Sequence, residues 1–243
     1  MRCIQWIILC GFAFAHAIVA APGRGADIAR DTADDPAYAK RPGWSSGENG
    51  GKGFKGWNLV AQGEPAEHRG FLIGDSREIN SDINSPAGFA FGMFAKGKGC
   101  TAEAYRTFQA PLDVGQSFSV DLAVNFRNGL KGIDLRAPAS EGERVIFNFT
   151  IGADDYVVHK AATENGTLGS DYDAKTAFTL RFTQTEANAG TWSIVRRGGV
   201  QAEKTGRYEG RAAGVKFFVL ETDGGRENGL WLNNLVIAAA PDR

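Results

Sequence analysis

The chain has 243 residues and a balanced charge, with 27 Lys and Arg, 28 Asp and Glu, and a formal net charge of −1. Acidic and basic residues are interspersed, which excludes the basic footprint typical of proteins that bind nucleic acid or an anionic membrane. This length suffices for one large β domain with a substantial core.

The first residues have the pattern of a secretory signal peptide. Arg2 precedes an apolar run that closes in small residues, and the run is shorter than the roughly 20 apolar residues of a membrane helix. We expect residues 1–21 to be removed and the mature protein, which has no second apolar run of that length, to be secreted or periplasmic. Removal also takes Cys3 and Cys10, so Cys100 remains alone and a disulfide scaffold is excluded.

The segment after the signal peptide has no apolar period, and we predict that residues 22–43 form a flexible leader. A glycine-rich stretch follows, RPGWSSGENGGKGFKGW, in which Gly43, Ser45 and Gly47 match the G-x-S-x-G pattern of a serine hydrolase. A nucleophile elbow needs a strand before the serine and a helix after it. Neither pattern is present, so we interpret the stretch as a loop and exclude Ser45 as a nucleophile.

From Trp57 onward, short runs alternate between apolar and polar residues, which is the signature of half-buried strands. Turn signals such as Asn128-Gly129 and Asp223-Gly224-Gly225 separate the runs, and no helical period persists for three turns. The sequence therefore predicts an all-β, antiparallel two-sheet jelly-roll sandwich as a single domain over residues 44–243. The expected strands are 71–73, 89–93, 104–108, 117–126, 145–151, 178–183, 192–195, 215–220 and 230–237.

The order of motifs resembles the concanavalin A-like lectin and glucanase jelly rolls of exported bacterial proteins, many of unassigned function. A Gly/Trp-rich opening precedes FAFGMF, then AYRTFQAPLDVGQSFSVDL, and last ENGLWLNNLVIA. The resemblance covers about residues 44–238 and implies the sandwich fold. The superfamily includes lectins, carbohydrate-binding modules, glucanases and polysaccharide lyases, and a shared fold does not choose among them.

Aromatic side chains beside polar ones are the candidate ligand contacts, because sugar rings stack on aromatic faces while their hydroxyls bond to polar groups. The alternative interpretation of Trp44 and Trp57 is that their indoles cap the open end of the core. The candidate ligand-binding residues are Trp44, Trp57, Asn58, Tyr105, Arg106 and Trp231.

Catalytic patterns are weak. Glycosidases need two carboxyls about 5–9.5 Å apart, and the glucanase-like E-x-D-x-x-E arrangement is absent from the sequence. A lyase would need a Tyr or His base beside a cation, but Tyr156 and His159 are three apart and would point to opposite faces of a strand.

Calcium is the candidate cofactor, since lectin-like sandwiches often hold it in loops and since turns supply carboxylates and carbonyls. The candidate ligands are Asp171, Asp173 and Asp223. We thus predict an exported module that binds extracellular polysaccharide or serves a structural role there. The alternative is a glycoside hydrolase or lyase on the same fold, and the sequence leaves the oligomeric state and the presence of an activity open.

Overall fold

The computed structural model describes residues 26–38, 44–79, 81–124, 129–142, 144–152, 155–169, 173, 175–221 and 228–240. The expected signal peptide, residues 1–21, lies outside this part of the chain. Among the described residues, no helix is both long and apolar enough to cross a membrane.

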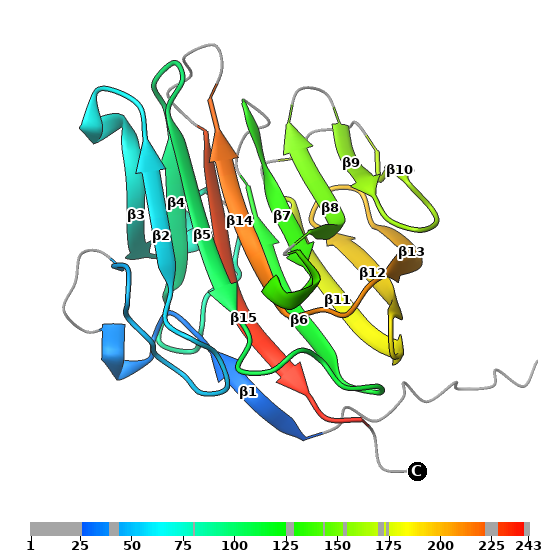
Figure 1. The fold of residues 1–243 in the computed structure, drawn as a ribbon. Coiled ribbons are helices and arrows are strands. Elements are labelled where there is room, and N and C mark those ends of the chain that lie inside the picture. Colours follow the sequence, from blue (N-terminus) through cyan, green and yellow to red (C-terminus); the bar gives the residue numbers. More distant parts are fainter. Residues whose placement is uncertain are drawn as a thin grey trace, which may run out of the picture.

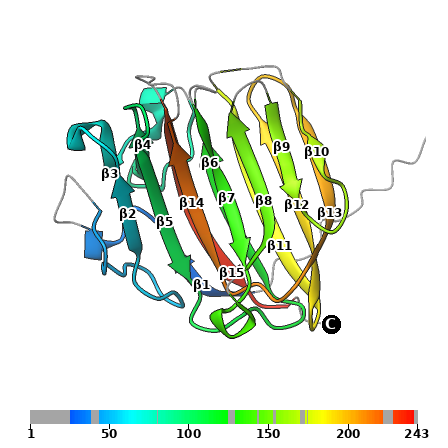
Figure 2. The ribbon, with the colours of Figure 1, turned by 45° about the horizontal axis from the view of Figure 1, so that its top comes forward.

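Two sheets packed face to face form the molecule (Figures 1 and 2), and the described strands pair only in antiparallel fashion. The predicted all-β jelly-roll sandwich is therefore confirmed. In spatial order, the eight-stranded sheet contains β13 (Ala202–Glu209), β12 (Ala189–Arg197), β11 (Ala177–Glu186), β6 (Ser117–Ala123), β15 (Gly229–Ala238), β4 (Ala90–Ala95) and β3 (Arg69–Gly74), with β1 (Asp27–Asp31) on β15. The seven-stranded sheet contains β10 (Gly166–Thr167), β9 (Asp155–Lys160), β8 (Val145–Gly152), β7 (Leu130–Arg136), β14 (Gly214–Leu220), β5 (Thr101–Thr107) and β2 (Asn58–Gln62).

Four single-turn 3₁₀ helices lie in the described connections: η1 (Pro36–Tyr38), η2 (Ala66–His68), η3 (Ser76–Ile79) and η4 (Ala139–Glu141). The alternating strands bury one face each, and aromatic rings fill the space between the sheets. Phe147 of the seven-stranded sheet, for example, meets Phe182 of the eight-stranded sheet edge to face at 4.9 Å. Such contacts between large rings supply much of the packing energy of a sandwich core.

The flexible leader predicted for residues 22–43 is wrong for residues 26–38. Asp27–Asp31 forms β1, which extends the eight-stranded sheet along the last residues of β15. The sequence pattern hid this strand because its inward end is a charged residue: the carboxylate of Asp31 lies in the core, 2.5 Å from the guanidinium of Arg106, and both side chains are fully buried. The domain therefore begins at the latest at Asp27.

The described part of the glycine-rich stretch, residues 44–57, is a loop, as predicted, and its glycines allow it to lie against β1 and η1. A Cβ on Gly50 would meet the ring of Tyr38 at 2.3 Å, and one on Gly51, whose φ is +69°, would meet the carbonyl of Arg30 at 2.0 Å. Ser45 only closes a turn, since its backbone N–H donates to the carboxylate of Glu48 at 2.8 Å. Close backbone approach explains the composition of this stretch.

The two outer faces of the sandwich differ. Over the eight-stranded sheet, the segment between β3 and β4 packs its Ile83 on Trp231. The side-chain amide of Asn233 fastens this segment, because it donates to the carbonyls of Ile83 and Phe89 at 3.0 and 2.9 Å. The outer face of the seven-stranded sheet instead carries a row of partly exposed polar side chains.

Candidate functional site

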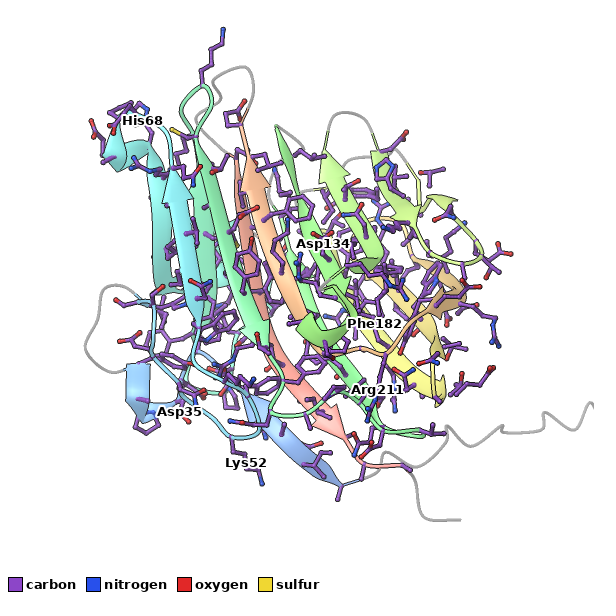
Figure 3. The ribbon with its side chains drawn as sticks, in the orientation of Figure 1. Asp35, Lys52, His68, Asp134, Phe182 and Arg211 are labelled. Carbon is purple, nitrogen blue, oxygen red and sulfur yellow. The ribbon has the colours of Figure 1, made fainter. Side chains whose placement is uncertain are left out.

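The register of the seven-stranded sheet places polar residues of five neighbouring strands in one row. Asn58 of β2 pairs with Tyr105 of β5, Tyr105 with Lys216 of β14, Lys216 with Asp134 of β7, and Asp134 with Asn148 of β8. Residues that pair across strands point to the same face, so the row crosses the middle of the sheet, where Figure 3 labels Asp134.

Two further residues of this face, each two positions from a member of the row on its own strand, complete the site. We call the whole set the polar strip, and it consists of Asn58, Glu103, Tyr105, Asp134, Arg136, Asn148 and Lys216.

Lys216 is the centre of a network of hydrogen bonds and ion pairs in the strip. Its Nζ lies 3.3 Å from Glu103 Oε1 and 3.1 Å from Asp134 Oδ2. Asn148 Nδ2 donates to Asp134 Oδ1 at 2.7 Å, and the Tyr105 hydroxyl donates to Glu103 Oε2 at 2.8 Å. Because these hydrogen bonds and ion pairs hold Glu103, Tyr105, Asp134, Asn148 and Lys216 together, these five side chains are fixed before any ligand arrives, which lowers the entropy cost of binding.

The network is shielded from water more than an ordinary surface ion pair is. The side chains of Asp134, Lys216 and Glu103 are 7%, 19% and 27% exposed. Burial, and then the neighbouring carboxylate of Glu103, raises the pKa of Tyr105 to about 12. The phenol is therefore protonated at neutral pH and serves as a hydrogen-bond donor, so it lacks the character of the general base that a lyase needs.

The strip ends in a pocket where β5, β14 and β7 meet the loops below them. Arg136 lies over the ring of Tyr105, with 5.7 Å from the guanidinium carbon to the ring centroid. Both residues line a cavity of about 160 Å³ together with Lys55 and the prolines 111 and 138. We call this cavity the end pocket.

Another polar cluster lies on the outer face of the eight-stranded sheet. Asp121 accepts hydrogen bonds from Thr179 at 2.6 Å and Asn234 at 2.9 Å, and Arg197 bonds to Thr179 at 2.9 Å. A cavity of about 230 Å³ adjoins Asp121, Thr179 and Asn234. It is a local hollow beside β1, whereas the polar strip runs across five strands and so matches an extended chain better.

Three of the predicted ligand contacts are tryptophans, and none presents a face to solvent. Trp44 and Trp57 are 3% and 1% exposed and pack on each other with ring centroids 5.0 Å apart. They cap the core, so their assignment as sugar platforms is wrong. Trp231 is also buried, and it lies on the outer face of the eight-stranded sheet under Ile83, away from the strip. In all three tryptophans the large apolar surface of the indole is buried in the protein, which is more favourable than exposing it to water.

The remaining predicted contacts lie on opposite faces of the seven-stranded sheet, because successive residues of a strand point to opposite sides. Asn58 and Tyr105 are paired neighbours on the polar strip. Arg106 follows Tyr105 and therefore points inward, where it pairs with Asp31, so its assignment as a ligand contact is wrong. The structure thus brings two of the six predicted ligand residues together.

Only one of the three predicted calcium ligands, Asp173, lies in the described part of the chain. Asp171 and Asp223 lie outside the described residues. Asp173 caps a turn, where its Oδ1 accepts the N–H of Lys175 at 2.7 Å. Within the described ranges, no group of three or more His, Cys, Asp or Glu is placed to hold a metal ion.

Sequence reasoning did not identify Glu103, Asp134, Arg136, Asn148 and Lys216 as site residues. The available signal was a charged or amide residue at alternate positions of a strand whose other positions are apolar, as in the stretches TAEAYRT and VKFF. That signal places a residue on an outer face. It does not reveal that β14 lies between β5 and β7, which comes only from the pairing of strands far apart in the chain.

Tyr156 and His159, the residues considered for a lyase, point to opposite faces of β9, as predicted from their spacing of three. Tyr156 is fully buried, with its ring 5.1 Å from that of Phe178, whereas His159 lies on an exposed part of β9. The two side chains therefore do not form a joint acid–base site.

No protein-family model matches the sequence, and no curated protein matches it. Solved structures with a similar fold include the cellulose-induced protein Cip1, with 11% identity over 75% of this chain and 90% of that one and a TM-score of 0.47. A β-1,3-glucanase from Mycobacterium marinum matches with 11% identity over 88% and 99% and a TM-score of 0.43. A family 11 carbohydrate-binding module from Clostridium thermocellum matches with 8% identity over 77% and 91% and a TM-score of 0.37. At these scores the matches carry no conclusion about binding or catalysis.

Proposed function

We propose that the polar strip binds an extracellular polysaccharide, and that the protein is an exported carbohydrate-binding module. The observation that carries this proposal is the row from Asn58 to Asn148, which offers amide, carboxylate, ammonium and phenol groups across five strands. Sites that recognise small polar units use a few fixed polar groups of this kind to orient the ligand. An extended row suits a polymer, because successive sugars meet successive strands.

Affinity electrophoresis in gels that contain single polysaccharides tests the proposal. We expect at least one neutral or acidic polysaccharide to retard the protein. Tyr105→Ala and Asn148→Ala should each weaken that binding by roughly tenfold, because each removes a hydrogen-bonding group of the strip.

Arg197→Ala, which removes a hydrogen-bonded side chain from the opposite outer face, is the matched control and should bind as the wild type does. The proposal fails if no polysaccharide retards the protein. It also fails if Arg197→Ala abolishes retardation and the strip variants do not, since the hollow near Asp121 would then be the site.

One observation favours a second candidate function, a glycoside hydrolase. Since Lys216 Nζ lies 3.3 and 3.1 Å from the two carboxylates, the oxygens of Glu103 and Asp134 are at most the sum of these distances, 6.4 Å, apart. Retaining glycosidases hold their two carboxyls about 5–5.5 Å apart. In this protein, however, the ammonium of Lys216 occupies the space between them, where a glycosidic oxygen would have to lie. We therefore favour binding.

A reducing-sugar assay on the polysaccharide that binds separates the two functions. We expect no release of sugar by the wild type. Release that disappears in Glu103→Gln and in Asp134→Asn would establish the hydrolase instead, and loss of binding in those variants without any release would support the module.

A further inference from the structure

We propose that the end pocket holds an acetyl group, so that the polysaccharide recognised by the polar strip carries acetamido or acetate-ester substituents. This inference rests on the proposed binding function and adds the chemical class of the ligand. An acetyl group has an apolar methyl end and a carbonyl oxygen that accepts hydrogen bonds. Three observations support the proposal: the apolar walls of the pocket, its open floor, and the polar residues where it joins the strip.

The walls of the end pocket differ in character from the polar strip. Most of the described residues that line the pocket are apolar, among them Pro111, Pro138, Ala139 and Ala213, and none is Asp or Glu. The fixed ring of each proline makes its part of the wall stiff. A methyl group gains free energy when it leaves water for such walls, whereas a hydroxyl placed there would lose its hydrogen bonds to water. The walls therefore favour an apolar substituent of the sugar.

The floor of the pocket is open at the central strand. Gly214 of β14 pairs with Thr107 of β5 on one side and with Arg136 of β7 on the other, so β14 contributes no side chain between them. The cavity volume of about 160 Å³ is several times the roughly 30 Å³ of one water molecule in the liquid. The four heavy atoms of an acetamido group fit this space together with the edge of the sugar ring.

Two residues bring hydrogen-bond donors to the same cavity, Thr107 and Lys55. Thr107 lies two positions after Tyr105 on β5, so both point to the outer face. The backbone fixes Lys55, because its N–H donates to the carbonyl of Thr107 at 2.9 Å and its carbonyl accepts a hydrogen bond from the buried guanidinium of Arg106. The hydroxyl of Thr107 and the ammonium of Lys55 can therefore donate to the carbonyl oxygen of an acetyl group whose methyl lies against the prolines.

The pocket continues the strip, because Tyr105 lines the pocket while its hydroxyl donates to Glu103 within the strip. A sugar ring on the strip can thus direct a substituent into the pocket. The acetyl group then adds affinity to a binding mode that the sugar hydroxyls already support. Burial of one methyl group contributes about fourfold in affinity, and a hydrogen bond to the carbonyl adds a further few-fold.

Calorimetric titration with matched oligosaccharides tests this inference. N-acetylglucosamine oligomers are compared with cello-oligosaccharides, which carry a hydroxyl in place of each acetamido group. Acetylated xylan and mannan oligomers are compared with the same oligomers after alkaline removal of the esters, and a galacturonate oligomer represents anionic ligands. We expect at least one acetylated oligomer to bind roughly tenfold more tightly than its acetyl-free counterpart. The two kinds of pair show whether an amide or an ester carries the acetyl group.

Variants of the pocket locate that difference. Ala139→Leu places a larger side chain in the cavity, so the acetylated oligomer should bind only as well as its counterpart, whose own affinity should not change. Ala66→Leu is the matched control, because Ala66 also follows a proline, begins a 3₁₀ helix and is exposed, but lies outside the end pocket. It should preserve the difference. The double variant Thr107→Val with Lys55→Met removes both donors and should reduce the preference to a few-fold.

Circular dichroism of each variant verifies that the sandwich is intact. Equal binding of acetylated and acetyl-free oligomers by the wild type, or tighter binding of the galacturonate oligomer than of every acetylated one, would overturn the inference and leave the proposed function intact. A preference that persists undiminished in Ala139→Leu or in the double variant would also overturn it, since the acetyl group would then bind elsewhere. Failure of every oligosaccharide and polysaccharide to bind would count against the proposed function and this inference together.

Discussion

Replacing Arg106 with Met is expected to lower the free energy of unfolding by about 3–5 kcal/mol, because it leaves a buried carboxylate without its partner. The guanidinium is fully buried, pairs with Asp31 at 2.5 Å and donates to the carbonyl of Gly50 at 2.9 Å. It also lies 4.8 Å from the ring centroid of Trp57. Burial raises the pKa of Asp31 to about 6, so this carboxyl is ionised at neutral pH and needs the cation.

Urea denaturation followed by tryptophan fluorescence measures the effect. Arg207→Met, which alters an exposed ion pair, is the control and should change stability by less than about 0.5 kcal/mol. The double variant Asp31→Leu with Arg106→Met should recover part of the loss, because it removes both charges. A change below about 1 kcal/mol for Arg106→Met would show that β1 is not anchored as described.

The stability of the wild type should rise by about 1.4 kcal/mol for each pH unit within the window between pH 7 and 10.5 through Lys131 alone. Lys131 points into the core from β7 and is fully buried. Burial lowers its pKa from 10.5 to about 7, an effect that Glu221 partly opposes. Within that window the folded protein binds fewer protons than the unfolded chain, so unfolding becomes harder as the pH rises.

Denaturation across this window, with Lys131→Met as the reference, isolates the contribution. Other groups titrate equally in both proteins, so the difference in unfolding free energy between wild type and variant should follow the stated slope. Parallel pH profiles would mean that Lys131 keeps its ordinary pKa and therefore reaches water.

The fold was predictable wherever strand alternation is regular. The expected strands over 145–151 and 178–183 lie within β8 and β11, which put aromatic rings inward and polar residues outward. Prediction failed where a polar side chain points into the core, because alternation then no longer marks the faces. For this reason the sequence did not predict β1, which contains the inward-pointing Asp31, or β7, which contains the inward-pointing Lys131. At the sheet edge, β13 escaped notice because most of its outward and inward positions are polar.

The candidate site was predictable only in part, for a different physical reason. Tyr105 and its neighbour Asn58 were singled out by residue type, and the structure places both on the strip. The assignment of the three tryptophans as ligand contacts was wrong, since residue type alone does not distinguish an exposed aromatic platform from a ring that caps the core. The partners Lys216 and Asp134 meet Tyr105 only because β14 pairs with both β5 and β7, strands that precede it in the chain by roughly 110 and 80 residues.

A crystal structure of the protein with the oligosaccharide that binds most tightly tests the central claim most directly. The account predicts sugar hydroxyls within hydrogen-bond distance of Tyr105, Lys216 and Asn148 on the outer face of the seven-stranded sheet, with the chain running across the strands. A ligand seated near Asp121 on the opposite sheet, with the polar strip left free, would contradict it.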